Sequence, residues 1–459
     1  MTAWATHQID LIRAIAEGFR PALVRELSLA KERHGDYLRL RLLGPFGFFI
    51  LSDPAAIQHV MVEQQAKYER GEPEWTHLRR VLGNGLILSD GDVHRSRRRI
   101  VYAAFTRKRL DRYASDVAKR VDEWVRRWRA SDDPVIDIHH EMTVLTLLII
   151  RDILFRDLPD DETLILGADI ATTNDAATHF DASLLGRASF IPTRANRRLR
   201  AASARIDATI GKVIAERLAR PGDRGDVLSV LLGYGELPPG CEPLDATAAR
   251  DEIVTLLAAG HETLACMLTW TWHLLAQNLD AERALHEEVD NVLGDGPFDA
   301  SLQPRLPYTM TVMRESMRLY PPVWVNGRQA ATEDEINGRP VKRGDMFWTP
   351  AFLVHRDPRW YPDPLRFDPD RFLPHAAAAR PRFAYFPYGG GNRQCVGQAL
   401  AELEGPLLIA AIAHAFAPRA VGRATPELVP MITLQPKGGM PMRLVQRAAA
   451  SRALEVSHA

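Results

Sequence analysis

Cysteine is scarce in this 459-residue chain, and nothing that resembles a targeting leader opens it. The three cysteines, Cys241, Cys266 and Cys395, stand at wide and unequal spacings. This odd set fits neither a disulfide framework nor a CxxC metal knuckle, so it predicts a reducing compartment. The first ten residues lack a basic stretch followed by an apolar one, which argues against a signal peptide. We therefore expect a soluble, cytoplasmic protein without a membrane anchor.

An excess of charge of one sign is also missing, because 58 Lys and Arg side chains balance 58 Asp and Glu side chains. A net charge of zero gives no whole-chain field that would attract nucleic acid or an acidic membrane. Nucleic acid is therefore not an expected partner. Hydrophobic residues make up 46% of the chain, which is enough for a large globular core. Length alone leaves the number of domains open.

Long apolar runs are nearly absent, and the main one extends from Ile253 to Ala276. Its centre holds Gly260-His261-Glu262-Thr263, and an acid at this place argues against contact with lipid. The run therefore predicts a long helix through the interior of a soluble protein, about 36 Å from end to end. The polar tetrad becomes a buried candidate for function.

Helical periodicity dominates the rest of the chain. Apolar residues recur three and four apart in Leu110–Arg129 and in Thr193–Arg220. The strand-like segments are short, and they are Tyr37–Leu43, Phe46–Ser52, Met431–Leu434 and Pro441–Val445. No long Ser/Gly linker and no repeat divides the sequence. The pattern predicts a mainly α fold with small β-sheets, with a helical lead-in over residues 1–34, one domain over 35–445 and a polar tail over 446–459.

One cysteine lies in a glycine-rich loop directly before a helical pattern. The loop contains Gly389-Gly390-Gly391, then Arg393 and Cys395, and the helical pattern runs from Gln398 to Phe416. Backbone amides, the start of a helix and a nearby arginine all favour a thiolate at Cys395. Such a sulfur is either a metal ligand or a nucleophile. The alternative is a small apolar side chain buried beside a tight turn.

This loop resembles the haem-binding signature of the cytochrome P450 family, Phe-x-x-Gly-x-Arg-x-Cys-x-Gly. The residues that match are Gly391, Arg393, Cys395 and Gly397, while Tyr388 stands where phenylalanine is usual. The resemblance implies haem b as cofactor, with Cys395 as the axial ligand of its iron. It also implies the family fold, in which haem lies between the long central helix and the helix after the cysteine. Gly405-Pro406 is expected to bend or break that second helix.

A second part of the resemblance joins two segments about fifty residues apart. Glu315 and Arg318 share one face of a helix, and alone such a pair is usually a solvent-exposed contact. The downstream segment Phe367-Asp368-Pro369-Asp370-Arg371-Phe372 resembles the family's Pro-Glu-Arg-Phe element, with Asp370 in place of Glu. The resemblance implies a buried structural triad of Glu315, Arg318 and Arg371 that fixes the loop carrying the cysteine.

Several basic residues match positions that hold the haem propionates in the family. His94 and Arg98 are four residues apart, which places both on one side of a helix. A cationic face of this kind is equally well a solvated surface. The resemblance assigns His94, Arg98, Arg328 and Arg393 to the propionates, and guanidinium groups are chemically suited to such carboxylates.

The tetrad in the long apolar run, with the alanine before it, resembles the family's oxygen-activation motif. In Ala259-Gly260-His261-Glu262-Thr263, the small Ala-Gly step leaves room for O2 and water. An acid followed by a hydroxyl suits proton delivery. Outside this context a helical threonine more often bonds back to a carbonyl, and a lone glutamate more often faces water. The resemblance implies that Glu262 and Thr263 are the catalytic pair.

Further basic residues near the cationic helix are candidates for a docking face, and they are Arg95, Arg97, Arg99, Arg107, Lys108 and Arg109. In the family the electron donor docks on the thiolate side of the haem, and such a patch acts mainly on the association rate. The alternative is a solubilising surface. The sequence shows no nucleotide-binding fingerprint and no flavin segment. We therefore expect a separate ferredoxin or flavodoxin-type donor with its reductase, and a monomeric enzyme.

The resemblance implies a haem-thiolate monooxygenase that uses O2 and two electrons to hydroxylate or epoxidise a lipophilic small molecule. By family position, the substrate pocket draws on the loop Glu72–Leu88 and on Leu256, Ala259, Val323, Val325, Asn326 and Ile432. Most of these side chains are apolar, which favours a lipophilic substrate. A terpenoid is favoured over a fatty acid, a steroid or a polyketide. Asn326 either orients the substrate or is a turn residue.

Two other classes of enzyme stay open. A haem-thiolate peroxygenase or isomerase would share the cysteine loop without O2 activation, although the Glu262-Thr263 pair argues against it. A hydrolase with Cys395 as nucleophile would need a base such as His355 or His414. That reading leaves the Glu315 and Arg318 pair and Arg328 without a role.

Overall fold

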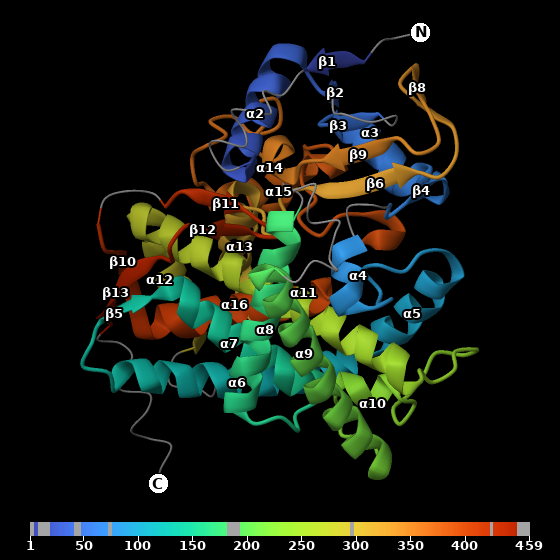
Figure 1. Cartoon of the computed structure of the whole chain (residues 1–459). Coiled ribbons are helices and arrows are strands. Elements are labelled where there is room, and N and C mark those ends of the chain that lie inside the picture. Colours follow the sequence, from blue (N-terminus) through green and yellow to red (C-terminus); the bar gives the residue numbers. More distant parts are fainter. Residues whose placement is uncertain are drawn as a thin grey trace.

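A computed structural model describes residues 4–7, 19–40, 47–71, 76–180, 193–293, 298–422 and 426–447 (Figure 1). Helices make up most of it, and small sheets lie at its edges. The predicted fold class, mainly α with small β-sheets, is confirmed. Residues 41–43 of the first predicted strand and residues 448–459 of the predicted tail lie outside the described part of the chain.

The longest helix, α11 (Ala246–Gln277), is the central element of the helical part (Figure 1). It begins seven residues before the predicted start, because Asp245 caps it and accepts a hydrogen bond from the Ala248 amide at 2.8 Å. Among the described residues it is the one helix long and apolar enough to cross a membrane, yet 78% of its most apolar window is buried inside the protein. The expectation of a buried core helix is confirmed.

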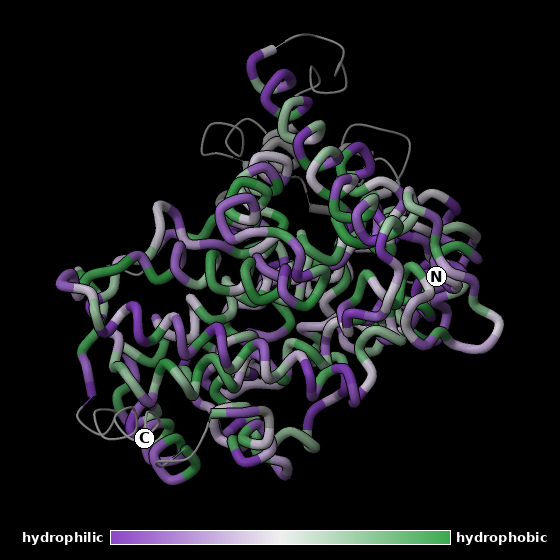
Figure 2. The backbone as a smooth tube through the Cα atoms, turned by 90° about the horizontal axis from the view of Figure 1, so that it is seen from below, coloured by the Kyte–Doolittle hydropathy of each residue, from purple (hydrophilic) through white to green (hydrophobic). Residues whose placement is uncertain are grey.

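Amphipathic helices surround α11 and contribute their apolar faces to one large core. The main ones are α6 (Arg107–Arg129), α7 (Ile138–Leu154), α8 (Asp160–Phe180), α9 (Arg194–Ala219), α12 (Leu279–Leu293), α13 (Pro307–Leu319) and α16 (Gln398–Ala415). Along these helices hydrophobic and hydrophilic segments alternate, as Figure 2 shows. The other α-helices in the described part of the chain are α2 (Phe19–His34), α3 (Pro54–Gln58), α4 (Thr76–Leu82), α5 (Gly91–Ala103), α10 (Val227–Leu231), α14 (Ala351–Val354) and α15 (Pro374–Ala378).

The largest sheet has the strand order β1-β2-β3-β9-β6-β4. Its strands are β1 (Ala5–His7), β2 (Tyr37–Leu40), β3 (Phe48–Leu51), β9 (Met346–Thr349), β6 (Asn326–Ala330) and β4 (Tyr68–Glu69). Because β1 pairs in parallel with β2, the lead-in predicted over residues 1–34 is not wholly helical, and its residues Ala5–His7 belong to this sheet. The sheet therefore joins the N-terminal segment to β6, which carries Arg328.

Three small sheets complete the fold. A three-stranded sheet has the order β10-β13-β5, with β10 (Phe416–Ala420), β13 (Pro441–Gln446) and β5 (Val135–Asp137). The two hairpins are β7 (Asp334–Ile336) with β8 (Arg339–Val341), and β11 (Leu428–Pro430) with β12 (Leu434–Pro436). The strand predicted over Met431–Leu434 is therefore wrong, since residues 431–433 form the turn of the second hairpin. An apolar run of this length does not distinguish a strand from a buried turn.

Of the bend or break predicted at Gly405 and Pro406, the break is wrong, because helix α16 continues through both residues to Ala415. A proline lacks the amide that would bond the carbonyl four residues earlier, here that of Glu402. In the fold, Gln303 Nε2 donates to this carbonyl at 3.2 Å and replaces the missing bond. A β-carbon on Gly405 would lie 2.6 Å from Met313 Sδ, so the glycine allows α13 to approach closely.

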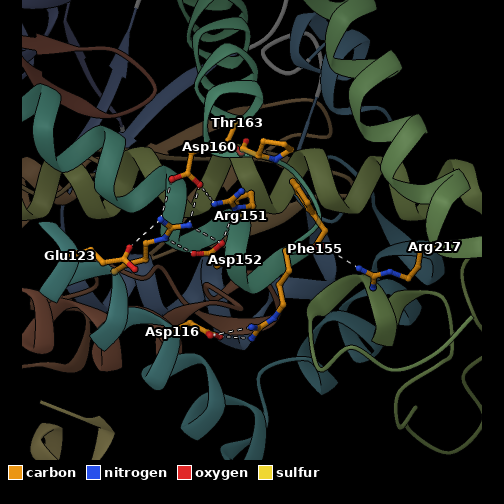
Figure 3. A network of polar contacts seen from close by, with 11 residues as sticks. Asp116, Glu123, Arg151, Asp152, Phe155, Asp160, Thr163 and Arg217 are labelled. Carbon is orange, nitrogen blue, oxygen red and sulfur yellow. Dashed lines mark hydrogen bonds and ion pairs between the residues drawn. The ribbon is translucent and has the colours of Figure 1, made fainter. Parts of the chain in front are cut away.

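A network of charged side chains joins α6, α7 and the start of α8 (Figure 3). Arg120 of α6 contacts Asp152 at 2.7 Å and Asp160 at 3.1 Å, and Arg151 contacts Asp152 at 2.8 Å. A second network centres on the fully buried Arg217 at the end of α9, which contacts Asp226 at 2.8 Å. These networks fix the ends of α8 and α9, the two helices that pack on each other beside α11.

Removal of Arg217 tests how far the fold depends on the second network. Arg217→Leu leaves the fully buried Asp226 without its cation, and we expect the free energy of unfolding to fall by about 3–5 kcal/mol. Thermal and urea unfolding measure this loss. Lys212→Leu is the matched control on the same helix, because Lys212 and its partner Glu162 are 59% and 41% exposed and their ion pair is screened. Equal losses in both variants would contradict the prediction.

Candidate active site

A large cavity lies between α11 and the cysteine loop with the start of α16. It holds about 1500 Å³ of open space including its mouth, and its wall is mainly apolar. Of the predicted site residues, those that line it are His94, Arg98, Leu256, Ala259, Thr263, Val323, Asn326, Arg393 and Cys395. These residues come from four distant parts of the sequence and meet around one space.

The loop before α16 places the Cys395 thiol at the cavity wall. Gly391 has a φ of +67°, and a β-carbon there would lie 1.8 Å from the Met61 carbonyl oxygen, so only glycine fits. The Cys395 amide donates to the Tyr388 carbonyl at 2.9 Å, which closes the turn. The side chain is open to the cavity, and protein surrounds it on the other sides.

Opposing effects act on the Cys395 thiol, for which the sequence predicts a thiolate. Burial raises the pKa of the thiol, and the Gly397 amide and Arg98 offset only part of this effect. A bound metal ion deprotonates a thiol directly, so the site is suited to a ligand sulfur. The bases proposed for a hydrolase, His355 and His414, do not line the cavity.

The predicted triad is assembled behind the cysteine loop. Glu315 and Arg318 are both fully buried and form two parallel contacts of 2.7 and 2.8 Å. Arg371 Nε lies 3.6 Å from Glu315 Oε1, which also accepts the Asp368 amide at 2.9 Å. The helix α13 and the segment around Phe367–Phe372 are thus held together by charge in the interior.

Arg318 extends this network toward the cysteine loop through His355, a role the sequence did not suggest. The Arg318 guanidinium donates to the carbonyls of His355, Pro364 and Arg366 at 2.7–3.0 Å. The His355 ring nitrogen Nε2 accepts the amide of Phe386, at the start of the loop, at 2.9 Å. Burial, with repulsion from Arg318, lowers the pKa of His355 to about 3, so the ring is neutral and able to accept.

A cluster of cations borders the cavity. Arg70, His94, Arg98 and Arg393 line it, and Arg328 is buried beside them. Burial, followed by repulsion from Arg70 and Arg393, lowers the pKa of Arg328 to about 9. Burial and the same arginines lower the pKa of His94 to about 4. Within the described residues no carboxylate forms an ion pair with Arg328, and Asp90, which pairs with Arg393, offsets only part of the positive charge. This side of the cavity therefore suits an anionic ligand.

The central turn of α11 contributes only part of the predicted catalytic pair to the cavity. Ala259, Gly260 and Thr263 line it, and the Thr263 hydroxyl donates to the Ala259 carbonyl at 2.7 Å. Glu262 points elsewhere and accepts hydrogen bonds from Asn174 of α8 and from Thr433 and Gln435 of the β11–β12 hairpin. The Glu262 carboxylate therefore faces neither the cavity nor water.

Two predicted pocket residues lie outside the cavity, and its wall includes residues that were not predicted to line it. Val325 packs in the core beside α2 and the large sheet, and Ile432 packs on the main core. Arg70 and Tyr388 line the cavity, as does Glu404, whose pKa burial raises to about 8. The signal for Glu404 was present, since it is an acid in an apolar helical run. Arg70 carried no comparable signal.

A cavity with one cysteine sulfur on its wall, a cationic rim and an apolar interior defines a site for a thiolate-ligated, anionic macrocycle. The family model described as Cytochrome P450 matches residues 17–441 of the chain. The protein therefore belongs to the cytochrome P450 family. It is a monooxygenase whose cofactor is haem b, and enzymes of this family use O2, electron-transfer partners and lipophilic substrates.

Relatives of this chain include cyclooctatin synthase from Streptomyces melanosporofaciens, which is 35% identical over 419 residues, or 90% of this chain and 88% of the relative. Pentalenene oxygenase from Streptomyces avermitilis is 31% identical over 386 residues, which cover 82% and 83% of the two chains. Among solved structures, a retinoic acid-bound cyanobacterial cytochrome P450 has a TM-score of 0.80 and 26% identity, with 91% and 93% of the chains covered.

The residues present fit haem. The Cys395 sulfur is open to the cavity, and the buried Arg328 with His94, Arg98 and Arg393 would hold the two propionates. When bound, haem supplies the redox chemistry that activates O2. The protein side chains then hold the cofactor, exclude water and position the substrate.

Loss of Glu315 tests whether the triad holds the cysteine loop in place. Glu315→Ala leaves Arg318 buried without its carboxylate, at a cost of about 3–5 kcal/mol, and we expect the purified protein to contain much less than one haem per chain. The haem-to-protein ratio measures this. Glu288→Ala is the control, because Glu288 accepts the Tyr308 and Thr309 amides at the other end of α13 and does not touch the loop. Full haem content in Glu315→Ala would refute the role.

Proposed function

We propose that this enzyme hydroxylates or epoxidises a terpenoid. The observation that carries the proposal is the apolar cavity above Cys395, whose wall includes Leu86, Ile87, Phe105 and Ile150. Such a surface binds a hydrocarbon skeleton by burial of apolar area and leaves few polar groups to orient it. Relatives that modify terpenoids, among them cyclooctatin synthase and pentalenene oxygenase, support the same substrate class.

One feature of the wall favours a second substrate class. Arg70 lines the cavity and matches none of the positions assigned to propionates. Arg70 belongs to the cationic cluster with His94, Arg98 and Arg393, and this side of the cavity also suits the carboxylate of a lipophilic acid. A terpenoid acid or a fatty acid is therefore the second candidate. Comparing the binding of a hydrocarbon with that of an acid of the same skeleton distinguishes the two substrate classes.

For proton delivery we propose that the Thr263 hydroxyl acts in the cavity and that Glu262 supplies protons to it. The Thr263 hydroxyl has its own oxygen free to accept a further hydrogen bond while it donates to Ala259. Glu262 serves this role only when its side chain turns away from Asn174, Thr433 and Gln435. A movement of α8 that breaks the contact with Asn174 would favour this turn.

The electron donor is proposed to be a separate ferredoxin or flavodoxin-type protein with its reductase. The predicted docking face becomes smaller, because Arg97 contacts the buried Glu252 at 3.1 Å and Arg109 contacts Asp223 at 3.1 Å. The basic side chains that stay at the surface are Arg95, Arg99, Arg107 and Lys108. We further propose a soluble, monomeric, cytoplasmic enzyme without a membrane anchor or a nucleic-acid partner.

Spectral titration tests the substrate class. Cyclic sesquiterpene and diterpene hydrocarbons are expected to displace water from the haem iron and shift the Soret band, at micromolar concentrations. Acids of the same skeletons should bind more weakly, and Arg70→Met should leave hydrocarbon binding unchanged. Tighter binding of the acids, lost in Arg70→Met, would move the proposal to the second class. Product formed with peroxide but not with O2 and a reduced donor would indicate a peroxygenase instead.

Coupling between electron use and product formation tests the proton-delivery pair. Thr263→Ala should consume O2 but release mainly hydrogen peroxide, because the cavity has lost the hydroxyl, whereas Glu262→Gln should slow turnover by about 100-fold. Thr263→Ser is expected to restore coupling. Thr269→Ala is the matched control, since its hydroxyl also bonds back within α11, to Ala265 at 2.7 Å, outside the cavity. Native coupling in Thr263→Ala would contradict the proposal.

A further inference from the structure

The segment of residues 83–89 between α4 and α5 lies directly on the N-terminal half of α11. Two of its residues, Leu86 and Ile87, line the cavity. A β-carbon on Gly85 would lie 2.1 Å from Thr255 Oγ1 and 2.7 Å from the Asp251 carbonyl oxygen, both on α11. Gly83, with a φ of +62°, lies equally close to Asp251. Gly85 therefore allows this part of the wall to approach the helix backbone, and Gly83 leaves room for the Asp251 carboxylate.

Adjacent carboxylates of α11 bind the amides of this segment. Asp251 Oδ2 accepts the Asn84 amide at 2.8 Å, and Glu252 Oε2 accepts the Leu86 amide at 3.0 Å. Glu252 is fully buried, and burial raises its pKa to about 6 in spite of these contacts. A buried carboxylate holds its hydrogen-bond partners in place, because each partner would be left unsatisfied without it.

Arg97 of α5 closes this arrangement from the other side. Its Nη1 contacts Glu252 Oε1 at 3.1 Å and donates to the Asn84 carbonyl at 2.6 Å. Glu252 thus reaches the segment twice, directly through the Leu86 amide and indirectly through Arg97. Arg79 adds a contact to the Leu88 carbonyl at 2.9 Å. These contacts satisfy backbone groups of the segment, and the Leu86 carbonyl accepts a further hydrogen bond from Arg393 at 3.4 Å. The apolar side chains of Leu86 and Ile87 are left to form the wall.

We propose that Glu252, together with Arg97, is a positioning residue that fixes Leu86 and Ile87 in the cavity wall and so determines which ligands fit. This role of Glu252 requires the haem site but does not depend on a terpenoid substrate. Glu252 lies outside the lining of the cavity and touches no cofactor-binding residue. Its effect on specificity is therefore indirect, through the 83–89 segment.

Two azoles of different size test the proposal on the haem-loaded enzyme. Imidazole binds the haem iron with little contact to the wall, whereas clotrimazole fills the cavity. In Glu252→Ala we expect the dissociation constant for clotrimazole to rise about tenfold or more, with that for imidazole nearly unchanged and with native haem content. Gly85→Ala should give the same selective loss, because it displaces the segment while Glu252 is intact. Equal changes for both azoles, or none, would overturn the proposal.

Asp245→Asn is the matched control. Asp245 is a carboxylate of the same helix that also accepts a backbone amide, that of Ala248 at 2.8 Å, but it does not reach the 83–89 segment. We expect native affinity for both azoles in this variant. If Glu252→Ala does not retain haem, Glu252→Gln, which keeps an acceptor for the Leu86 amide but weakens the contact with Arg97, should show a smaller loss of the same kind.

Amide hydrogen exchange gives a second readout that does not depend on a ligand. Peptides that cover residues 83–89 should exchange faster in Glu252→Ala than in the native holoenzyme and in Asp245→Asn, while peptides from the second half of α11 should not change. Native exchange in the segment would refute the positioning role even if azole affinity fell. Absence of any imidazole spectrum in the native enzyme would instead refute the haem site.

Discussion

The buried contact between Glu315 and Arg318 is the interaction on which the rest of the site depends. Its two parallel hydrogen bonds fix the planar guanidinium, so the remaining donors of Arg318 point in defined directions. These donors end on the carbonyls of His355, Pro364 and Arg366, which belong to the chain that leads to the cysteine loop. The neutral ring of His355 in turn accepts a hydrogen bond from the Phe386 amide, which extends these fixed contacts to the cysteine loop. The position of the Cys395 sulfur thus depends on an ion pair that does not line the cavity.

The central helix α11 likewise uses buried polar contacts to fix the wall of the cavity opposite the cysteine loop. Its acids point away from the cavity and bind segments that are remote in sequence. Glu252 holds the Leu86 amide, and Glu262 holds Asn174 of α8 and the turn of the β11–β12 hairpin. The apolar face of α11 is thereby left for ligand, while its polar residues secure the elements around it. Buried carboxylates would be costly here without such partners, and each is satisfied by at least two donors.

Sequence reasoning located the parts of the site that reside in short motifs, namely the cysteine loop, the Glu315 and Arg318 pair and the Ala259 to Thr263 turn. It failed where a distant partner decides the outcome. Pro406 does not break α16, because Gln303 supplies the missing donor, and Arg97 is not a surface cation, because Glu252 lies behind it. The direction of the Glu262 side chain was likewise set by residues 88 to 173 positions away. None of these partners is marked by local periodicity or spacing.

The cationic rim of the cavity links cofactor binding to stability. Arg328 repels Arg70 and Arg393 in an interior where burial already disfavours its charge, and His94 stays neutral for the same reasons. The fold nevertheless brings these groups together, which is unfavourable for the protein alone. Two carboxylates at this rim would add attraction to that of Asp90, which already pairs with Arg393, in a medium of low dielectric. Binding of haem would therefore offset a repulsion that folding creates, and the cofactor would add to the stability of the native protein.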